Sequence, residues 1–496
     1  MATKTPANAS DTYKQQIQAI VPRSVSNSVV LFGDSRAAQC GKNIQVTSVT
    51  AVGTTATVTF ANHDMIDGQQ FVIGGADESP YNGVFTVTNT AANTFDYVMA
   101  SAPAVSPAVP SGAEINMTNW IQQTDKGFFN WGNAQLGGRF NVVFNAALGG
   151  DTAQNMATRT SDVTQFTPDY CVHFGFINGV GSRTSAQIIA DLTTIYTSML
   201  NAGIIVIACT DIPYVTGASG YTAAGSKTLL IVNNWIRNYC RSTKNMILVD
   251  AYKLLVDGTS ATGDPLAGMM AAADGIHLTP KGGRAVGNEF YNVLNSIVPQ
   301  CNSLAVSQID DYTTDTSNPN VVINGMMQGV AGTNTNSTGD VATSWTLDGT
   351  TLATCVGSLV SRADGLGQDQ RIVATPNANN DLLKFYTSGS LHTRFAAGDT
   401  VYFEIDVSIT SAADILKGLF FRLQTSIDGN SVDVAAMTTT STDNLDNADM
   451  TNFVFRSNPF TYPAGSTITS TFIWLQFYFS GAGSATIDIG RVVLRK

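Results

Sequence analysis

The sequence predicts an α/β protein whose central sheet is doubly wound and parallel, with two added β-rich regions. The first observation is a set of short, almost continuous apolar segments, which are typical of parallel strands covered on both faces. These segments are 28–32, 141–148, 169–174, 203–209 and 245–250. The second is that segments of helical periodicity lie between several of them. The third is that 43–115 and 304–496 instead show period-two alternation with Gly and Asn turn signals.

Four helices are expected to cover the sheet. The clearest is 185–203, where apolar residues recur at helical spacing and Gly203 ends the pattern. The segment 120–138 is also helix-like and stops at a glycine pair. Two further helices are expected at 224–242 and 281–297.

These patterns divide the chain into four parts. Residues 1–19 are an N-terminal segment, and 20–42 together with 116–300 form the α/β domain. Residues 43–115 form a small β module inserted into that domain, with a linker rich in Pro, Ser and Ala at 101–112. Residues 304–496 are predicted to form a C-terminal β-sandwich, because regular short strands with turn signals are typical of that architecture. A length of 496 residues fits roughly three domains.

The composition argues against several classes of partner. The chain has 26 Lys and Arg against 37 Asp and Glu, which gives a formal net charge of −11. Nucleic acid is not expected, because binding a phosphate backbone needs a basic surface. A membrane span is not expected either, because no run of about 18 apolar residues occurs. The polar N-terminus lacks the apolar segment of a signal peptide.

The six cysteines do not form a recognisable framework. None belongs to a CxxC pair, so the sequence predicts no structural zinc site. Cys171 and Cys209 lie inside apolar strand-like segments and are expected to be buried free thiols.

Ser35 is the first candidate for chemistry, because Gly33-Asp34-Ser35 directly follows a buried strand. Ligands of parallel sheets bind at the carboxyl ends of the strands. A serine in the first turn of the next helix also lies among free backbone N–H groups, which favour an anion. That position suits a nucleophile, but an ordinary helix N-cap explains the same three residues equally well.

A serine nucleophile needs a base, and histidine is the usual one. The sequence has four: His63, His173, His277 and His392. His63 lies in the insert and His392 in the C-terminal region, while His173 is expected to pack within a strand. His277 lies in a loop before the last helix, three residues after Asp274, whose carboxylate could orient the imidazole. A glycine turn with a surface histidine is the alternative.

Taken together, four segments resemble the motif blocks of the SGNH hydrolase (GDSL esterase/lipase) family, in the family's order. They are GDS (33–35), NAALGGDTAQNM (145–156), HFGFINGVG (173–181) and DGIHLTPKG (274–282). The resemblance covers 20–42 and 116–300 and implies a flavodoxin-like sheet. It implies a catalytic triad of Ser35, His277 and Asp274, with an oxyanion hole from Ser35, Gly150 and Asn178. No metal or organic cofactor is implied.

The sequence departs from the family pattern at two places. Arg36 follows the nucleophile where leucine is common, and it is expected either to face substrate or to lie on the surface. The third block usually reads Gly-x-Asn-Asp, whereas here it reads Phe176-Ile177-Asn178-Gly179. That difference bears directly on the placement of the Asn178 amide.

The accessory regions also carry resemblances. The insert resembles small β modules of bacteriophage tail and other virion proteins. The C-terminal region resembles jelly-roll carbohydrate-binding or galactose-binding-like domains, although a purely structural sandwich is an open alternative. Trp345, Phe385 and Tyr386 are its candidates for stacking on a sugar.

The combined expectation is a serine esterase that removes O-acetyl groups from bacterial surface polysaccharide. It would act at the host cell surface as a phage tail spike or fibre within the virion. Capsule or O-antigen polysaccharide, phage tail proteins and two further copies of the chain in a homotrimer are the expected partners. One alternative is a bacterial carbohydrate esterase or lipase. The other is a virion adhesin without catalytic activity, against which the intact Ser35, Asp274 and His277 argue.

Overall fold

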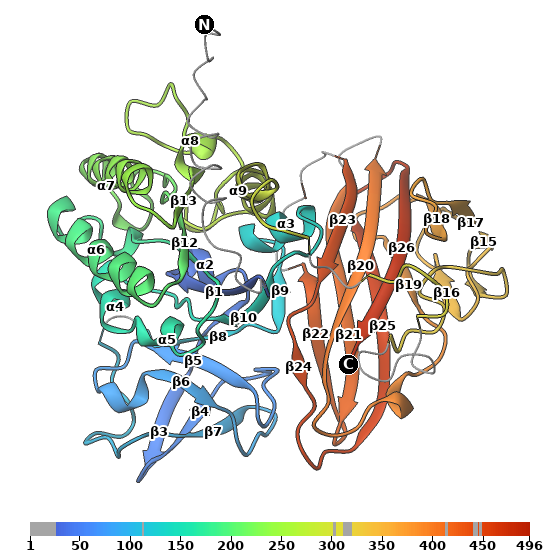
Figure 1. Ribbon diagram of the computed structural model, residues 1–496, viewed down its shortest axis with the longest axis horizontal. Coiled ribbons are helices and arrows are strands. Elements are labelled where there is room, and N and C mark those ends of the chain that lie inside the picture. Colours follow the sequence, from blue (N-terminus) through green and yellow to red (C-terminus); the bar gives the residue numbers. More distant parts are fainter. Residues whose placement is uncertain are drawn as a thin grey trace, which may run out of the picture.

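The computed structural model describes residues 26–111, 114–300, 304–310, 320–411, 415–439, 445 and 449–496. The predicted N-terminal segment 1–19 lies outside these residues, as does most of the boundary segment 310–320. Figure 1 shows an α/β part, a small β part below it and a larger β part beside both.

A five-stranded parallel sheet forms the centre of the α/β part, in the order β10-β1-β11-β12-β13. Its strands are β1 (Ser28–Gly33), β10 (Asn141–Asn145), β11 (Tyr170–Phe174), β12 (Ile205–Cys209) and β13 (Met246–Val249). In chain order this is a 2-1-3-4-5 sheet, the doubly wound flavodoxin-like order. The predicted fold class of this part is therefore confirmed, because five short apolar segments form five buried parallel strands.

Helices cover both faces of this sheet (Figure 1). Those of the α/β part are α2 (Ser35–Ala38), α3 (Phe128–Gln135), α4 (Ala153–Thr158), α5 (Ser161–Thr164), α6 (Ser185–Asn201), α7 (Ala223–Ser242), α8 (Ala251–Leu255) and α9 (Pro280–Leu294). Threonine caps begin the longer ones: Thr184 forms a capping box with Gln187, and Thr279 precedes a proline in the first turn of α9. None of the described helices is both long and apolar enough to cross a membrane.

The helix predicted at 120–138 is wrong in its first half. Residues Gln122–Thr124 form a strand, β9, and only 128–135 are helical, as α3. β9 pairs in parallel with a strand of the C-terminal region, β22 (Asn430–Thr438). This partner lies more than 300 residues away in the sequence, so local periodicity could not reveal it.

The insert forms two small antiparallel sheets around its own core, which includes Phe71, Phe95 and Tyr97. One sheet has the order β2 (Lys42–Gln45), β8 (Asn116–Asn119), β5 (Gln70–Gly74), β6 (Gly83–Thr86), and the other β3 (Ser48–Val52), β4 (Thr55–Thr59), β7 (Thr94–Val98). β8 thus belongs to the insert's sheet, although the sequence places it in the α/β domain.

The C-terminal region forms two larger sheets. The first contains β14 (Thr333–Thr335), β16 (Trp345–Asp348), β19 (Leu382–Thr387), β25 (Ile468–Phe479), β21 (Leu416–Ile427), β22 and β9. The second contains β15 (Thr338–Gly339), β17 (Thr354–Ser361), β18 (Gln368–Thr375), β26 (Ala485–Arg495), β20 (Thr400–Ser411) and β23 (Met450–Arg456), and β24 (Phe460–Thr461) pairs with β20. Ring contact between Phe421 and Phe455, 5.1 Å between centroids, joins the two sheets. A jelly-roll arrangement stays a prediction.

This C-terminal region is packed against the α/β part. Besides the β9–β22 pairing, Trp131 of α3 contacts Phe455 at 6.0 Å between ring centroids. The Asn458 amide donates to the Trp120 carbonyl, and the Gln123 amide donates to the Arg456 carbonyl at 2.7 Å. These buried contacts make the two parts one hydrophobic core instead of tethered modules.

Two of the three proposed sugar-stacking residues are wrong. Trp345 and Phe385 are fully buried and stack on each other, with 4.8 Å between ring centroids. Their alternation along β16 and β19 points them into the core, which the sequence could not distinguish from the outer face. Tyr386 points the other way and stacks on Trp474 at 4.1 Å.

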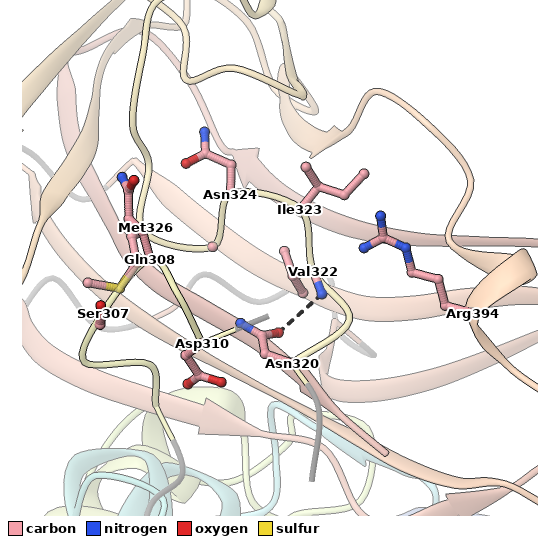
Figure 2. Close-up of a pocket in the computed structure, with 10 residues that line it drawn as sticks. Ser307, Gln308, Asp310, Asn320, Val322, Ile323, Asn324, Met326 and Arg394 are labelled. Carbon is pink, nitrogen blue, oxygen red and sulfur yellow. Dashed lines mark hydrogen bonds between the residues drawn. The ribbon is translucent and has the colours of Figure 1, made fainter. Parts of the chain in front are cut away.

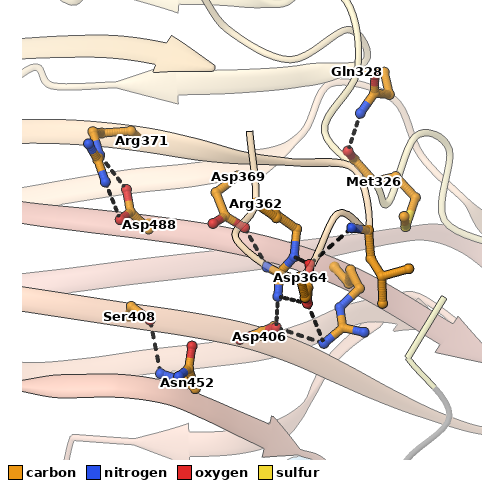
Figure 3. A network of polar contacts seen from close by, with 12 residues as sticks. Met326, Gln328, Arg362, Asp364, Asp369, Arg371, Asp406, Ser408, Asn452 and Asp488 are labelled. Carbon is orange, nitrogen blue, oxygen red and sulfur yellow. Dashed lines mark hydrogen bonds and ion pairs between the residues drawn. The ribbon is translucent and has the colours of Figure 1, made fainter. Parts of the chain in front are cut away.

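A network of ion pairs holds strands of the second C-terminal sheet (Figure 3). Arg362 pairs with Asp364 at 2.9 Å, Asp369 at 2.5 Å and Asp406 at 2.8 Å, and Arg491 pairs with Asp406 at 3.1 Å. Because these residues come from β18, β20, β26 and the turn after β17, the network links neighbouring strands.

Candidate active site

The candidate nucleophile lies at the carboxyl end of the first strand of the parallel sheet. Ser35 begins α2 directly after β1, and 8% of its surface is exposed. Glycine is required at position 33, because an added Cβ would lie 1.9 Å from the Phe174 carbonyl oxygen on β11. Asp34 caps the helix by accepting the Arg36 N–H at 2.9 Å. The Ser35 N–H lies in the first turn, where a helix offers it no acceptor.

The structure brings the three predicted triad residues together. The Ser35 hydroxyl lies 2.8 Å from His277 Nε2, and His277 Nδ1 lies 2.8 Å from Asp274 Oδ2. The second oxygen of Asp274 accepts the backbone N–H groups of Ile276 and His277, each at 2.9 Å. Asp274 therefore holds both the imidazole ring and the turn that carries it.

The carboxylate of Asp274 is strongly stabilised in its charged form. Burial alone would raise its pKa, but the side-chain and backbone hydrogen bonds from His277, together with that from Ile276, outweigh burial and hold the pKa well below its usual value. Asp274 thus stays ionised in mildly acidic solution. An ionised carboxylate at Nδ1 keeps the proton there and leaves Nε2 free to accept the Ser35 proton.

The two other predicted oxyanion donors lie on adjacent loops. Gly150 follows β10 in an exposed turn with φ of +81°, a conformation that favours glycine. Asn178 lies in a 3₁₀ turn, Ile177–Gly179, which follows β11. Its amide donates to the Asp151 carbonyl at 3.0 Å, so Asn178 is joined to the residue after Gly150.

Arg36 is neither on the surface nor free to face a substrate, so both expectations for it are wrong. Its side chain is fully buried and pairs with the buried carboxylate of Asp211, which follows β12. Its Nε also donates to the Ile276 carbonyl at 3.1 Å, next to His277. Arg36 therefore connects the nucleophile's helix to the loop of the base. Sequence reasoning missed Asp211, whose only signal was an acidic residue at the end of a buried strand.

Two buried carboxyl groups fix the turn before Asn178. Asp211 accepts the Phe176 N–H at 2.8 Å, and Asp34 accepts the Ile177 N–H at 3.3 Å. Burial, followed by the charge of Asp211, raises the pKa of Asp34 to about 8. These contacts support the unusual third block, which lacks the family's aspartate after its asparagine.

The other three histidines lie away from the triad. His173 is buried on β11, with Nδ1 3.2 Å from the Tyr196 hydroxyl, and burial lowers its pKa to about 3. His63 contacts the Ala91 carbonyl within the insert. His392 contacts Ser390 in the C-terminal region.

Two cavities lie elsewhere in the molecule. One of about 250 Å³ lies beside Asn320 and Arg394 in the C-terminal region (Figure 2). A larger one of about 500 Å³ lies between the insert and the C-terminal sheets, next to His63 and Asp428. Neither is lined by a triad residue.

Within the described part of the chain, no three His, Cys, Asp or Glu side chains are grouped as metal ligands.

Comparison with known proteins supports the hydrolase interpretation of this region. Residues 112–285 match the model of the GDSL-like Lipase/Acylhydrolase family. The matched range begins near the end of the insert, so it does not include Ser35. The fold places Ser35 beside His277, which lies within the matched range. No curated protein matches the chain.

Several solved structures align with parts of the chain. A carbohydrate esterase of family 3 from Talaromyces cellulolyticus is 18% identical, with 35% of this chain and 91% of that chain covered and a TM-score of 0.29. A GDSL-like lipase from Bacteroides thetaiotaomicron is 12% identical, with 58% and 94% covered and a TM-score of 0.30. An acetyl xylan esterase is 18% identical, with 34% and 91% covered and a TM-score of 0.28. These likenesses are too loose to transfer a substrate.

Proposed function

Because the chain carries a hydrolase domain of the GDSL (SGNH) type, we propose that it is a serine carboxylic ester hydrolase acting through an acyl-enzyme on Ser35. The observation that carries this proposal is the continuous chain of two 2.8 Å contacts from Ser35 through His277 to Asp274. A serine alone at this position would be an ordinary helix start. A serine whose hydroxyl meets an oriented imidazole is an activated nucleophile.

The reaction proceeds in two acyl-transfer steps. His277 Nε2 takes the Ser35 proton as Oγ attacks the ester carbonyl carbon, and the carbonyl oxygen becomes an oxyanion. The Ser35 and Gly150 N–H groups and the Asn178 amide stabilise that charge. The tetrahedral intermediate collapses as His277 protonates the departing alcohol, which leaves acyl-Ser35. Water, deprotonated by His277, then releases the carboxylic acid and restores the Ser35 hydroxyl.

The proposed substrate is an O-acetyl group on bacterial surface polysaccharide. Support comes from the two β-rich regions beside the hydrolase domain and from the low charge of the chain, 13% Asp, Glu, Lys and Arg. Neutral glycans present hydroxyls and few charges, which uncharged Thr, Ser and Asn side chains match. The half-buried Tyr386–Trp474 pair is an aromatic surface on the C-terminal region that a sugar ring can contact.

The test compares three substrates with one protein and its Ser35→Ala variant. We expect hydrolysis of p-nitrophenyl acetate, release of acetate from purified O-acetylated capsule, and little hydrolysis of long-chain esters. Ser35→Ala should abolish all turnover with little change in thermal unfolding. A preference for long-chain esters would contradict the polysaccharide substrate and indicate a lipase. If the protein hydrolysed no ester, the non-catalytic adhesin would be the remaining alternative.

The setting we propose is a phage tail spike or fibre, built as a homotrimer in the virion. Its support is the resemblance of the insert to virion β modules. Light scattering of the purified protein should give three times the chain mass of 52.4 kDa. A monomer would contradict the trimer.

A further inference from the structure

The loop that carries Gly150 rests on a strand of the inserted module. The Thr118 hydroxyl donates to the Ala147 carbonyl at 2.8 Å, and the Asn116 amide donates to the Gly149 carbonyl at 3.3 Å. Both donors come from β8, and both are almost fully buried. Residues two apart on a strand share a face, so one face of β8 is turned toward this loop.

The module and the loop also lie close together around these hydrogen bonds. A Cβ added to Gly149 would lie 2.8 Å from the side-chain amide nitrogen of Asn43, a residue of the insert's β2. A Cβ added to Gly74 on β5 would lie 2.6 Å from Leu148 Cδ1. Each distance is shorter than real Cβ atoms show, so a neighbouring side chain would have to move to admit a methyl group, and the module and the loop are in close contact here.

The supporting strand is itself held on both sides. β8 pairs with β2 along its whole length and with β5 through residues 116–118. Met117, between the two donors, points the opposite way into the module's own core. β8 is therefore held in place by backbone pairing at both edges and by its own core residue.

The hydrolase domain also holds this loop, at one residue before Gly149 and at one residue after Gly150. The Leu148 N–H donates to the Gly33 carbonyl at 3.1 Å, and the Asp151 carbonyl accepts the Asn178 amide at 3.0 Å. Between these two anchors, the carbonyl of Gly149 is held by Asn116. That carbonyl belongs to the same peptide group as the Gly150 N–H, so fixing one fixes the direction of the other.

We propose that β8 of the inserted module positions the oxyanion hole, with Asn116 and Thr118 as positioning residues for the Gly150 N–H. The proposal rests on the proposed esterase function, because it gives the Gly150 N–H the role of oxyanion donor. The insert is then a part of the catalytic apparatus and is not a removable attachment. Its sheet aligns a donor that stabilises charge only in the transition state.

The test is a set of substitutions on β8 in the full chain. Thr118→Val keeps the side-chain shape and removes the donor, Asn116→Ala removes the other, and Thr118→Ser keeps the hydroxyl. Thr57→Val is the matched control, because Thr57 donates to Asp96 at 2.6 Å within the insert's other sheet. Steady-state hydrolysis of p-nitrophenyl acetate and thermal unfolding are measured for each.

We expect kcat to fall about 10-fold in Thr118→Val and in Asn116→Ala, and roughly 10²-fold in the double variant that combines these two substitutions. Small misplacements of catalytic groups lower the rate by this much. KM should change less than about twofold, since the donor acts on the transition state. Thr118→Ser should restore most of the activity, and Thr57→Val should leave it unchanged. A boronic acid that forms a tetrahedral adduct with Ser35 should lose affinity in parallel with kcat/KM.

Wild-type kcat in folded Thr118→Val and Asn116→Ala would overturn the proposal. So would an equal loss in Thr57→Val, which would indicate a general effect of loosening the module. If the double variant does not fold, the contrast between Thr118→Val and Thr118→Ser decides. Failure of the proposed function gives a different result, because the unaltered protein would then hydrolyse no ester and bind no boronic acid.

Discussion

The two halves of the candidate active site are held in different ways. On the side of the base, Asp274 lies three residues from His277 and hydrogen-bonds both its ring and its backbone. On the oxyanion side, two side chains of the insert's β8 hold the loop of Gly150, and the buried carboxyl groups of Asp34 and Asp211, which follow β1 and β12, hold the backbone just before Asn178. The base and the carboxylate that orients it come from one loop, whereas the oxyanion side is assembled from distant parts of the chain.

The position of the insert in the chain accounts for this difference. The insert interrupts the chain between the nucleophile's helix and the oxyanion loop, yet it leaves the loop of the base untouched. Its sheet then occupies the space beneath the oxyanion loop. The base should therefore tolerate changes in the insert, whereas the oxyanion donors should not.

The largest expected effect comes from breaking the side of the base. His277→Ala should lower kcat by roughly 10⁴-fold or more, because the Ser35 proton then has no acceptor. Adding Ser35→Ala should make little further difference, since triad members act as a unit. Asp274→Asn should cost roughly 10²–10⁴-fold. Kinetics on p-nitrophenyl acetate measure all three, and strong activity in His277→Ala would show that another group is the base.

Arg36→Met should lower the thermal stability, because it breaks the link from the nucleophile's helix to the loop of the base. Removing one partner of a buried ion pair typically costs about 3–5 kcal/mol, since the other charge stays buried. We expect a large fall in Tm, partly recovered when Asp211→Asn is added. The exposed Arg241→Met is the control. An unchanged Tm in Arg36→Met would mean that the pair does not hold the structure together.

Asn178→Ala should break the oxyanion side alone. Loss of one oxyanion donor typically costs roughly 10²–10³ in kcat, so we expect that fall with little change in KM. Asn201→Ala, which changes an exposed residue at the end of α6, should behave like the wild type. If KM rises instead and kcat is normal, Asn178 binds substrate and the oxyanion assignment is wrong.

The smallest expected effect concerns His173, which lies on β11 but outside the triad. Its folded-state pKa, about 3, lies below the ordinary 6.5 because the ring is buried. Between these values the unfolded chain takes up a proton that the folded protein does not, so stability falls as pH falls from about 6.5 toward 3. His173→Gln should flatten this slope of Tm against pH. An unchanged slope would contradict it, and His392→Gln is the control.

Much of the α/β part could be predicted because its signals are local. Five apolar segments between helices are enough to indicate a buried parallel sheet, and helical spacing with a stop at Gly203 marks the helix at 185–203. Ser35, Asp274 and His277 could be named because each lies in a short motif with a fixed place relative to a strand or helix. The structure then brought them within hydrogen-bonding distance.

The rest depended on partners far away in the sequence. β9 looked helical because its pairing with β22 is invisible to local periodicity. Arg36 looked exposed because its partner, Asp211, follows a different strand. Trp345 and Phe385 looked available to a sugar because alternation along a strand does not say which face is inside. In each case the deciding contact is tertiary.

Covalent labelling tests whether Ser35 is an activated nucleophile. The protein is treated with a fluorophosphonate, which forms a stable tetrahedral adduct only with an activated serine, and the labelled peptide is identified by mass spectrometry. We predict one adduct, on Ser35, that is lost in Ser35→Ala and strongly slowed in His277→Ala. Absence of labelling, or labelling of another serine with Ser35 unmodified, would contradict the account.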